Sequence, residues 1–323
     1  MATMAGEAGI TEKDTALLAL ITYLKEQRYQ FITPTPATHA RILARSPNAP
    51  AQNLRDVFGW SRPFDPEQID QQLLRILHQA DAIEQHGARM KSRLRVSSLG
   101  QQLFLHSAYP TDAEDAVFFG PDSYRFARLI THQLTRCPEQ KGARLVDIGT
   151  GAGVGAIVAA HLCPSVEIIV TDINPFALRL ARINAQAAGV QAKFIETGDL
   201  AQIDGDFDLL LANPPYIADT EGRAYRDGGG MHGGEISLEM ARQALPRLAA
   251  GGRFILYTGS AIVDGKDQLH EQLAQLSQQE RCLLHYEEMD PDVFGEELKN
   301  EAYKDVERIA VIAAVIERQA SLR

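Results

Sequence analysis

The fold of this chain is decided by the stretch Asp147-Ile148-Gly149-Thr150-Gly151-Ala152-Gly153-Val154-Gly155. The apolar segment before it reads as a strand, and the segment after it, through Ala160, reads as a helix. Alternating glycines allow a tight turn and let a ligand come close to the backbone. The first turn of the helix that follows offers free N–H groups. The stretch therefore predicts a strand, a ligand-binding loop and a helix in immediate succession.

Strands and helices alternate from about residue 144 to the end of the chain. Apolar runs predict seven strands, at 143–149, 166–172, 192–197, 207–213, 253–259, 282–288 and 307–316, with helices near 235–249 and 265–279. This alternation predicts an α/β fold, a Rossmann-like and mostly parallel seven-stranded sheet with helices on both faces. Ligands of such sheets bind beyond the carboxyl ends of the strands, near the switch in strand order.

The first third of the chain has a different pattern. A length of 323 residues favours two domains, and we place them at 1–110 and 111–323. Helical spacing predicts a helix at 14–30 with Asp14 as N-cap, a proline-rich break at 33–50, and a second helix that opens with Asp65 as N-cap and Pro66 at N1. A turn at His86-Gly87 then leads into a small β-ribbon. These features predict a smaller, mainly helical, winged-helix-like domain that recognises the substrate.

Four basic residues alternate in the ribbon segment: Arg89, Lys91, Arg93 and Arg95. On one continuous strand they would share a face. That face would contact an anion such as RNA, or it would be a solvated face whose charges discourage edge pairing.

Composition narrows the function classes. Hydrophobic residues make up 45% of the chain. The 32 Lys and Arg against 42 Asp and Glu give a net charge of −10, which argues against extensive binding to nucleic acid or to an anionic membrane. The N-terminal segment lacks the pattern of a signal peptide. Three distant cysteines, Cys137, Cys163 and Cys282, show no disulfide framework and no metal-ligand spacing. We therefore expect a cytoplasmic protein without a metal.

Three carboxylates follow successive predicted strands. Asp147, at the first strand tip, would repel a pyrophosphate and suit a cationic ligand, such as the ammonium and sulfonium end of S-adenosylmethionine. The stretch from Gly151 to Ala156 also fits the dinucleotide pattern GxGxxA, which leaves a nicotinamide cofactor open. Asp172 would accept hydrogen bonds from a ribose and Asp199 from an adenine amino group. Together they predict a nucleoside pocket.

The fourth predicted strand ends in Asn213-Pro214-Pro215-Tyr216. The two prolines fix the backbone and remove donors. The Pro214 carbonyl and the Asn213 amide then offer two acceptors, which is what a planar –NH2 group needs to be oriented for attack on a methyl group. Tyr216 would stack on the flat substrate.

These motifs resemble those of class I S-adenosylmethionine-dependent methyltransferases over roughly residues 117–316. VDIGTGAGVG resembles motif I, VTDINP motif II, GDL the adenine motif and LLLANPPYI motif IV. The NPPY form resembles amino-methyltransferases, among them the release-factor glutamine enzymes and RNA guanine-N2 and adenine-N6 enzymes. The segment Phe118 to Tyr124 lies where these enzymes have a cofactor lid, but it departs from the Pro-Arg-Pro-like pattern of the glutamine enzymes, which argues against a release-factor substrate.

With this resemblance we predict three sets of site residues. The cofactor-binding set is Asp147, Gly149, Thr150, Gly151, Gly153, Asp172, Ile173, Asp199, Leu200 and Asn213. The catalytic set is Asn213, Pro214, Pro215 and Tyr216. The substrate-binding set is Tyr216, Arg226 and Tyr124.

A glycine-rich insertion follows the NPPY motif at 218–234. It contains Tyr225-Arg226-Asp227-Gly228-Gly229-Gly230, which resembles a segment of bacterial methyltransferases with helical N-terminal domains. Arg226 would contact a carbonyl or phosphate, His232 would assist proton removal, and the glycines would let the loop close over the target. The alternative is a plain surface connection.

The sequence therefore predicts an N-methyltransferase that uses S-adenosylmethionine and acts on a planar amino or amide nitrogen of a macromolecule, a protein glutamine or an RNA base. The alternatives are a nicotinamide-dependent oxidoreductase and a catalytically silent S-adenosylmethionine-binding module. We expect no membrane partner.

Overall fold

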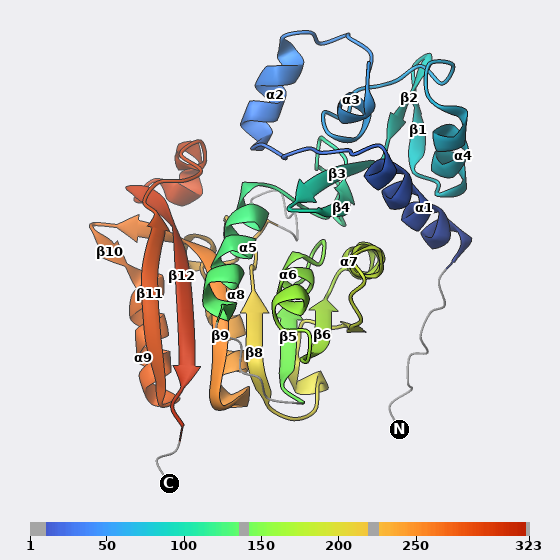
Figure 1. The fold of residues 1–323 in the computed structure, drawn as a ribbon. Coiled ribbons are helices and arrows are strands. Elements are labelled where there is room, and N and C mark those ends of the chain that lie inside the picture. Colours follow the sequence, from blue (N-terminus) through green and yellow to red (C-terminus); the bar gives the residue numbers. More distant parts are fainter. Residues whose placement is uncertain (1–10, 136–141, 219–225, 321–323) are drawn as a thin grey trace. The chain divides into compact units, whose positions relative to one another are not determined.

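The computed structural model describes residues 11–135, 142–218 and 226–320 (Figure 1). The chain forms two compact units. The first comprises residues 1–111, 119–121 and 186–189, and the second comprises residues 112–118, 122–185 and 190–323.

The first unit contains four helices: α1 (Glu12–Glu26), α2 (Pro36–Ala44), α3 (Leu54–Phe58) and α4 (Gln71–Gln79). Helix α1 begins one turn earlier than predicted. Its N-cap is Thr11, whose hydroxyl accepts from the Asp14 N–H at 3.1 Å, while the Asp14 carboxylate accepts from the Thr11 N–H at 3.0 Å. Asp14 is therefore the third residue of a capping box and not the cap.

The prediction that a helix opens at Asp65 is wrong. Helix α4 begins at Gln71, and Asp70 is its N-cap, with Oδ1 accepting from the N–H groups of Gln72 and Leu73. Phe64 exchanges two backbone hydrogen bonds with Met90, at 2.8 and 3.0 Å. This distant pairing keeps the chain extended before residue 65 and delays the helix.

Two antiparallel hairpins complete the first unit. Strand β1 (Ile83–His86) pairs with β2 (Arg89–Ser92), and β3 (Leu94–Leu99) pairs with β4 (Gln102–Ser107). Gly87, with φ of 62°, makes the turn that the sequence predicts at His86-Gly87.

The basic residues do not share one strand face, so that prediction is also wrong. The strand breaks at Arg93, whose N–H bonds the Ala82 carbonyl. Arg95 lies on β3, is 4% exposed and donates from Nε to the Gly59 carbonyl at 3.0 Å. Lys91 donates to the Tyr109 carbonyl at 2.8 Å. Arg93 lies 3.8 Å from each of two carboxylates. Hydrogen bonds and ion pairs within the first unit thus engage these basic side chains.

The second unit is a helix-covered sheet (Figure 1). Its strands are β5 (Arg144–Ile148), β6 (Glu167–Asp172), β7 (Lys193–Glu196), β8 (Phe207–Ala212), β9 (Leu248–Val263), β10 (Lys266–Asp267), β11 (Cys282–Asp290) and β12 (Arg308–Arg318). The spatial order is β11-β12-β9-β8-β5-β6-β7, with β10 paired to β9. Strands β5 to β9 run parallel, and β12 is antiparallel to both neighbours. The predicted α/β fold and its mostly parallel sheet are confirmed, with the two-residue β10 added to the seven predicted strands.

Helices flank the sheet: α5 (Pro121–Leu134), α6 (Val154–Leu162), α7 (Pro175–Ala187), α8 (Glu235–Ala244) and α9 (Gln268–Gln279). Alternate strand residues enter two apolar cores. Leu209 and Leu211 of β8 join one core, with α5 and α6, whereas Leu210 and Ala212 join the other, with α8 and α9. Because both faces are buried, the central strands are continuous apolar runs, as expected of a parallel sheet. The chain order reverses between β5 and β8, which creates the switch point.

Among the described residues, no helix is long and apolar enough to cross a membrane. Cys282 is a free thiol. Cys137 lies outside the described residues. The cytoplasmic location therefore stays a prediction.

Candidate functional site

The glycine loop leaves β5 at the switch point. Gly149, Gly151 and Gly153 have φ of 63°, 56° and 87°, in the left-handed region that favours glycine. A Cβ added to Gly151 would meet no atom within 4 Å. The loop therefore presents bare backbone beside open space, as a close-fitting ligand requires.

Asp147 lies beneath this loop and not at its surface. It is 1% exposed, and its Oδ2 accepts from the Thr150 hydroxyl at 2.6 Å and from the Ala156 N–H at 2.9 Å. Burial raises the pKa of Asp147 to about 6. The loop's own donors engage this carboxylate, which braces the turn; its contact with a cationic ligand stays a prediction.

Asp172, at the end of β6, joins the second strand tip to the loop. Its Oδ2 accepts from the Gly151 N–H and its Oδ1 from the Asn174 N–H, both at 2.9 Å. Burial raises its pKa, and these backbone N–H bonds oppose the rise. Next to it, Ile173 is 65% exposed. A large, exposed apolar side chain at a strand tip can pack against a flat ring of a ligand.

The third strand tip carries Asp199 and Leu200. The exposed Asp199 accepts from the Ala201 N–H at 2.8 Å and caps a short 3₁₀ helix, Leu200–Gln202. Leu200 is 3% exposed and packs in the core beneath. The cofactor-binding roles of Asp199 and Leu200 stay predictions.

Asn213 follows β8 directly, next to the glycine loop, because Ala212 pairs with Ile148 of β5. Its side chain is partly exposed and makes no hydrogen bond to any residue that the structure describes. Pro214 is buried and Pro215 is half-buried. The amide is thus available to bind the –NH2 group of a methyl acceptor, and this role stays a prediction.

The glycine-rich segment is bonded to the NPPY strand end. The Ile217 N–H donates to the Arg226 carbonyl at 3.1 Å, and the Gly228 N–H donates to the Ile217 carbonyl at 2.8 Å. The Arg226 guanidinium is ion-paired with Glu297, so a substrate would have to compete for it. His232 Nε2 lies 3.1 Å from Asp305 Oδ1. Tyr225 lies outside the described residues.

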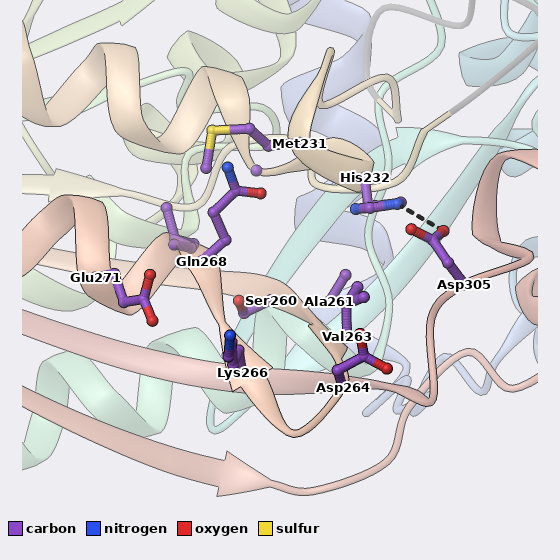
Figure 2. Close-up of a pocket in the computed structure, with 12 residues that line it drawn as sticks. Met231, His232, Ser260, Ala261, Val263, Asp264, Lys266, Gln268, Glu271 and Asp305 are labelled. Carbon is purple, nitrogen blue, oxygen red and sulfur yellow. Dashed lines mark hydrogen bonds and ion pairs between the residues drawn. The ribbon is translucent and has the colours of Figure 1, made fainter.

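A cavity of about 360 Å³ opens at the carboxyl end of β9, beside this segment (Figure 2). Figure 2 shows the His232–Asp305 pair on one side of it and Met231 with Gln268 on the other. Its charged lining residues are Asp264, Lys266, Glu271, Asp305 and His232. No motif in the sequence indicated this cavity, because its residues come from separate turns.

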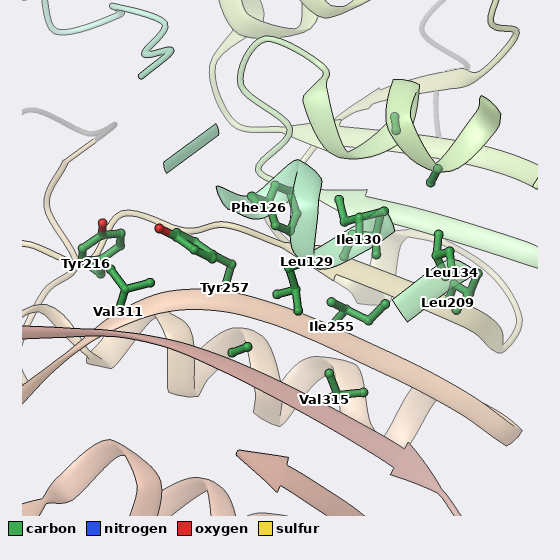
Figure 3. Close-up of a cluster of buried hydrophobic side chains, with 14 of the residues drawn as sticks. Phe126, Leu129, Ile130, Leu134, Leu209, Tyr216, Ile255, Tyr257, Val311 and Val315 are labelled. Atoms are coloured by element: carbon green, nitrogen blue, oxygen red, sulfur yellow. The ribbon is translucent and has the colours of Figure 1, made fainter. Parts of the chain in front are cut away.

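Tyr216 is buried and hydrogen-bonded, and its stacking on a substrate stays a prediction. It is 7% exposed, and its hydroxyl donates to Asp122 Oδ2 at 2.7 Å. Figure 3 shows it beside Tyr257 at one end of the buried cluster. Tyr124, on α5, is half-buried. Asp122 and Tyr257 are functional candidates that the sequence analysis missed, because they lie far from Tyr216 in the chain.

Comparisons with known proteins agree with this geometry. Residues 127–281 match the family described as "Methyltransferase small domain". A release factor glutamine methyltransferase of Bradyrhizobium diazoefficiens is 31% identical over 225 residues, which cover 64% of this chain and 74% of that protein. The enzyme of the same description from Deinococcus radiodurans is 38% identical over 124 residues, 35% of this chain and 44% of that protein.

Coverage differs among the relatives. The chain spans about half the length of two of them, the Deinococcus protein at 44% and a release factor glutamine methyltransferase of Koribacter versatilis at 53%. Among solved structures, a Methanocaldococcus jannaschii tRNA m1G37 methyltransferase matches with a TM-score of 0.47 and 16% identity, over 71% of this chain and 58% of that one.

The Bradyrhizobium match is long enough to establish the family, and the strand order, the glycine loop and the strand-end carboxylates fit it. A nicotinamide oxidoreductase is therefore set aside. The chain belongs to the class I S-adenosylmethionine-dependent methyltransferases.

Proposed function

We propose that this protein transfers the methyl group of S-adenosylmethionine to a planar amide or amino nitrogen of a macromolecule. One observation carries the proposal: the Asn213 amide, which is hydrogen-bonded to none of the described residues, lies at the end of β8, one strand away from the glycine loop.

The residues at the switch point fit this cofactor. Open space at Gly151 and the exposed Ile173 side chain leave room for a nucleoside and a surface for its base. Asp172 would accept from the ribose hydroxyls and Asp199 from the adenine amino group. S-Adenosylmethionine, when bound there, supplies an electrophilic methyl group.

The chain's own residues orient the nitrogen. The Asn213 side-chain oxygen and the Pro214 carbonyl would each accept one N–H of the target –NH2 group. With both hydrogens held, the nitrogen lone pair points out of the NH2 plane for in-line attack. Transfer would form the N–C bond as the S–C bond of the cofactor breaks, and the nitrogen would then lose one proton to solvent or to a nearby base.

Charge favours a protein amide over an RNA base as acceptor. The net charge is −10, and Lys91, Arg93 and Arg95 of the first unit are engaged within it. The cavity at the carboxyl end of β9 is lined by three carboxylates, those of Asp264, Glu271 and Asp305, against one lysine, Lys266. A phosphodiester backbone would be repelled there.

Radiolabelled methyl transfer into an extract of cells lacking this protein tests the proposal. Half of the product is treated with protease and half with RNase before counting. Label lost to protease alone is expected. Label lost to RNase alone would make the acceptor an RNA base. If no label enters protein or RNA although cofactor binding is confirmed separately, the acceptor is a small molecule or the protein is a silent binding module.

A further inference from the structure

We propose that Asp122 is a positioning residue of the acceptor site, which anchors Tyr216 and thereby sets the direction of the Asn213 amide and the Pro214 carbonyl. The effect of Asp122 on catalysis rests on the proposed function. The structural part of the inference, that Asp122 fixes the NPPY segment, is independent of the reaction.

Asp122 collects donors from three elements. It lies in the first turn of α5 and is 6% exposed. Its Oδ2 accepts from the Tyr216 hydroxyl at 2.7 Å, and its Oδ1 accepts from the Tyr257 hydroxyl on β9 at 2.8 Å. Arg125 Nη1 donates to Oδ1 at 3.2 Å and its Nη2 donates to Asp290 at 3.1 Å. Hydrogen bonds to a buried charged group are among the stronger ones in proteins.

Both tyrosines remain donors over the working pH range. Burial, and next the charge of Asp122, raise the pKa of Tyr216 well above its usual value, and the same two causes raise the pKa of Tyr257. The anchor therefore places the Asp122 carboxyl group between two neutral tyrosine hydroxyls and the Arg125 guanidinium.

The rest of Tyr216 is enclosed as closely as its hydroxyl. A Cβ added to Gly259 of β9 would overlap the Tyr216 ring, and one added to Gly233 would overlap the Tyr216 carbonyl. Phe294 packs edge-on against the ring, with centroids 5.8 Å apart. Gly228 approaches the Tyr216 Cα so closely that an added Cβ would lie 2.7 Å from it. The Tyr216 residue fills the space at Gly259 and Gly233, and at Gly228 the Gly233 carbonyl fills it together with Tyr216.

A rigid connection carries this constraint to the acceptor atoms. Only Pro214 and Pro215 separate Asn213 from Tyr216, and each proline fixes its own φ near −65°. The other side of the segment is held by β8, whose last residue pairs with β5. Fixing Tyr216 therefore leaves Asn213 and the Pro214 carbonyl little freedom to rotate.

The test uses Asp122→Asn and Tyr216→Phe, singly and together, with Tyr286→Phe as the matched control. Tyr286 is also a tyrosine whose hydroxyl donates to a carboxylate, Asp267 at 2.6 Å, but it lies on β11 away from the NPPY segment. Methyl-transfer rates, KM for the acceptor, Kd for S-adenosylmethionine and Tm are measured for each.

If Asp122 acts through Tyr216, either single variant lowers kcat about tenfold, the double variant loses no more than the Asp122→Asn variant, and Kd for the cofactor stays within about twofold. The control variant keeps its kcat even if its Tm falls. Additive losses, an equal loss in the control, or a loss of cofactor affinity as large as the loss of kcat would overturn the proposal.

A second readout does not require activity. With ¹⁵N-asparagine labelling, the side-chain amide resonance of Asn213, assigned through Asn213→Ala, is expected to shift or broaden in Tyr216→Phe and Asp122→Asn but not in Tyr286→Phe. An unchanged resonance in both anchor variants would refute the positioning role. If this resonance shifts while the unaltered protein methylates nothing, the proposed function fails and the anchor stands.

Discussion

The Gly151 N–H donates to Asp172 Oδ2 across 2.9 Å, which ties the glycine loop to the tip of the neighbouring strand. Thr150 strengthens the same junction, because its N–H donates to the Thr171 carbonyl at 3.0 Å. One carboxylate thus holds the loop in shape and lies at the edge where a ribose would bind.

Replacing Asp172 by Asn should therefore weaken cofactor binding. The amide keeps one acceptor oxygen, so it cannot hold both Gly151 and Asn174 and still accept from a ribose. We expect Kd for S-adenosylmethionine to rise at least about tenfold, or 1.4 kcal/mol, measured by titration calorimetry. The control is Asp204→Asn, which lies just before the amino end of β8, away from the carboxyl ends of the strands. Equal losses of cofactor affinity in both variants would contradict the assignment of Asp172 to the cofactor site.

Ile173 offers an apolar surface that only a bound ligand would cover. Ile173→Asn should leave the free energy of unfolding within about 0.5 kcal/mol, because the side chain is 65% exposed. Cofactor affinity should fall roughly tenfold, as expected from the loss of an apolar side chain's burial. Leu283→Asn removes another exposed apolar side chain, on β11, and should leave the affinity unchanged. No difference between the two variants would exclude Ile173 from the site.

The raised pKa of Asp147 predicts a pH dependence of stability. Its ordinary value is 3.8 and its folded value is about 6, so the unfolded chain ionises this group first. The free energy of unfolding should therefore fall as pH rises through this window, by about 3 kcal/mol for a shift of about two pKa units. Asp147→Asn should remove this slope. Urea unfolding between pH 4 and pH 7 measures it, and parallel curves for the two proteins would refute the buried, turn-bracing role given to this carboxylate.

The sequence predicts the second unit well, because its strands are apolar runs buried on both faces and its first loop needs glycine for backbone reasons. Strand β5 and strand β8 begin and end within a residue of their predicted bounds. The first unit is predicted less well. A bridge between Phe64 and Met90 decides where α4 begins, and no local pattern reveals a pairing across that distance.

In the candidate site, too, backbone features are predicted from the sequence better than side-chain contacts. Backbone requirements at Gly149, Gly151 and Gly153 can be read from the sequence, whereas the fate of a side chain depends on what packs on it. Tyr216 is buried because Asp122, 94 positions earlier, accepts its hydroxyl. Arg95 looks like a surface charge until its hydrogen bond to Gly59 is known.

Asn213→Ala tests the acceptor role directly. The variant should lose turnover while Kd for S-adenosylmethionine stays within about tenfold, a 1.4 kcal/mol change, because the amide has no partner in the described structure whose loss would disturb the fold. Asn48→Ala, in the first unit, serves as the control for asparagine truncation. Turnover equal to that of the unaltered protein would sink the proposed role of Asn213.

The glycines after the NPPY motif are predicted to act by close packing and not by loop opening. Gly233 and Gly251 both have positive φ, 98° and 78°, so alanine at either position strains the backbone by about 1–2 kcal/mol. Only at Gly233 would the new Cβ also overlap the Tyr216 carbonyl, since nothing lies within 4 Å at Gly251. Gly233→Ala should therefore cost about 1–3 kcal/mol more in urea unfolding and lower kcat, whereas Gly251→Ala should keep kcat. If both variants lose the same stability and keep full activity, the segment does not clasp Tyr216, and the alternative of a plain surface connection is the better account.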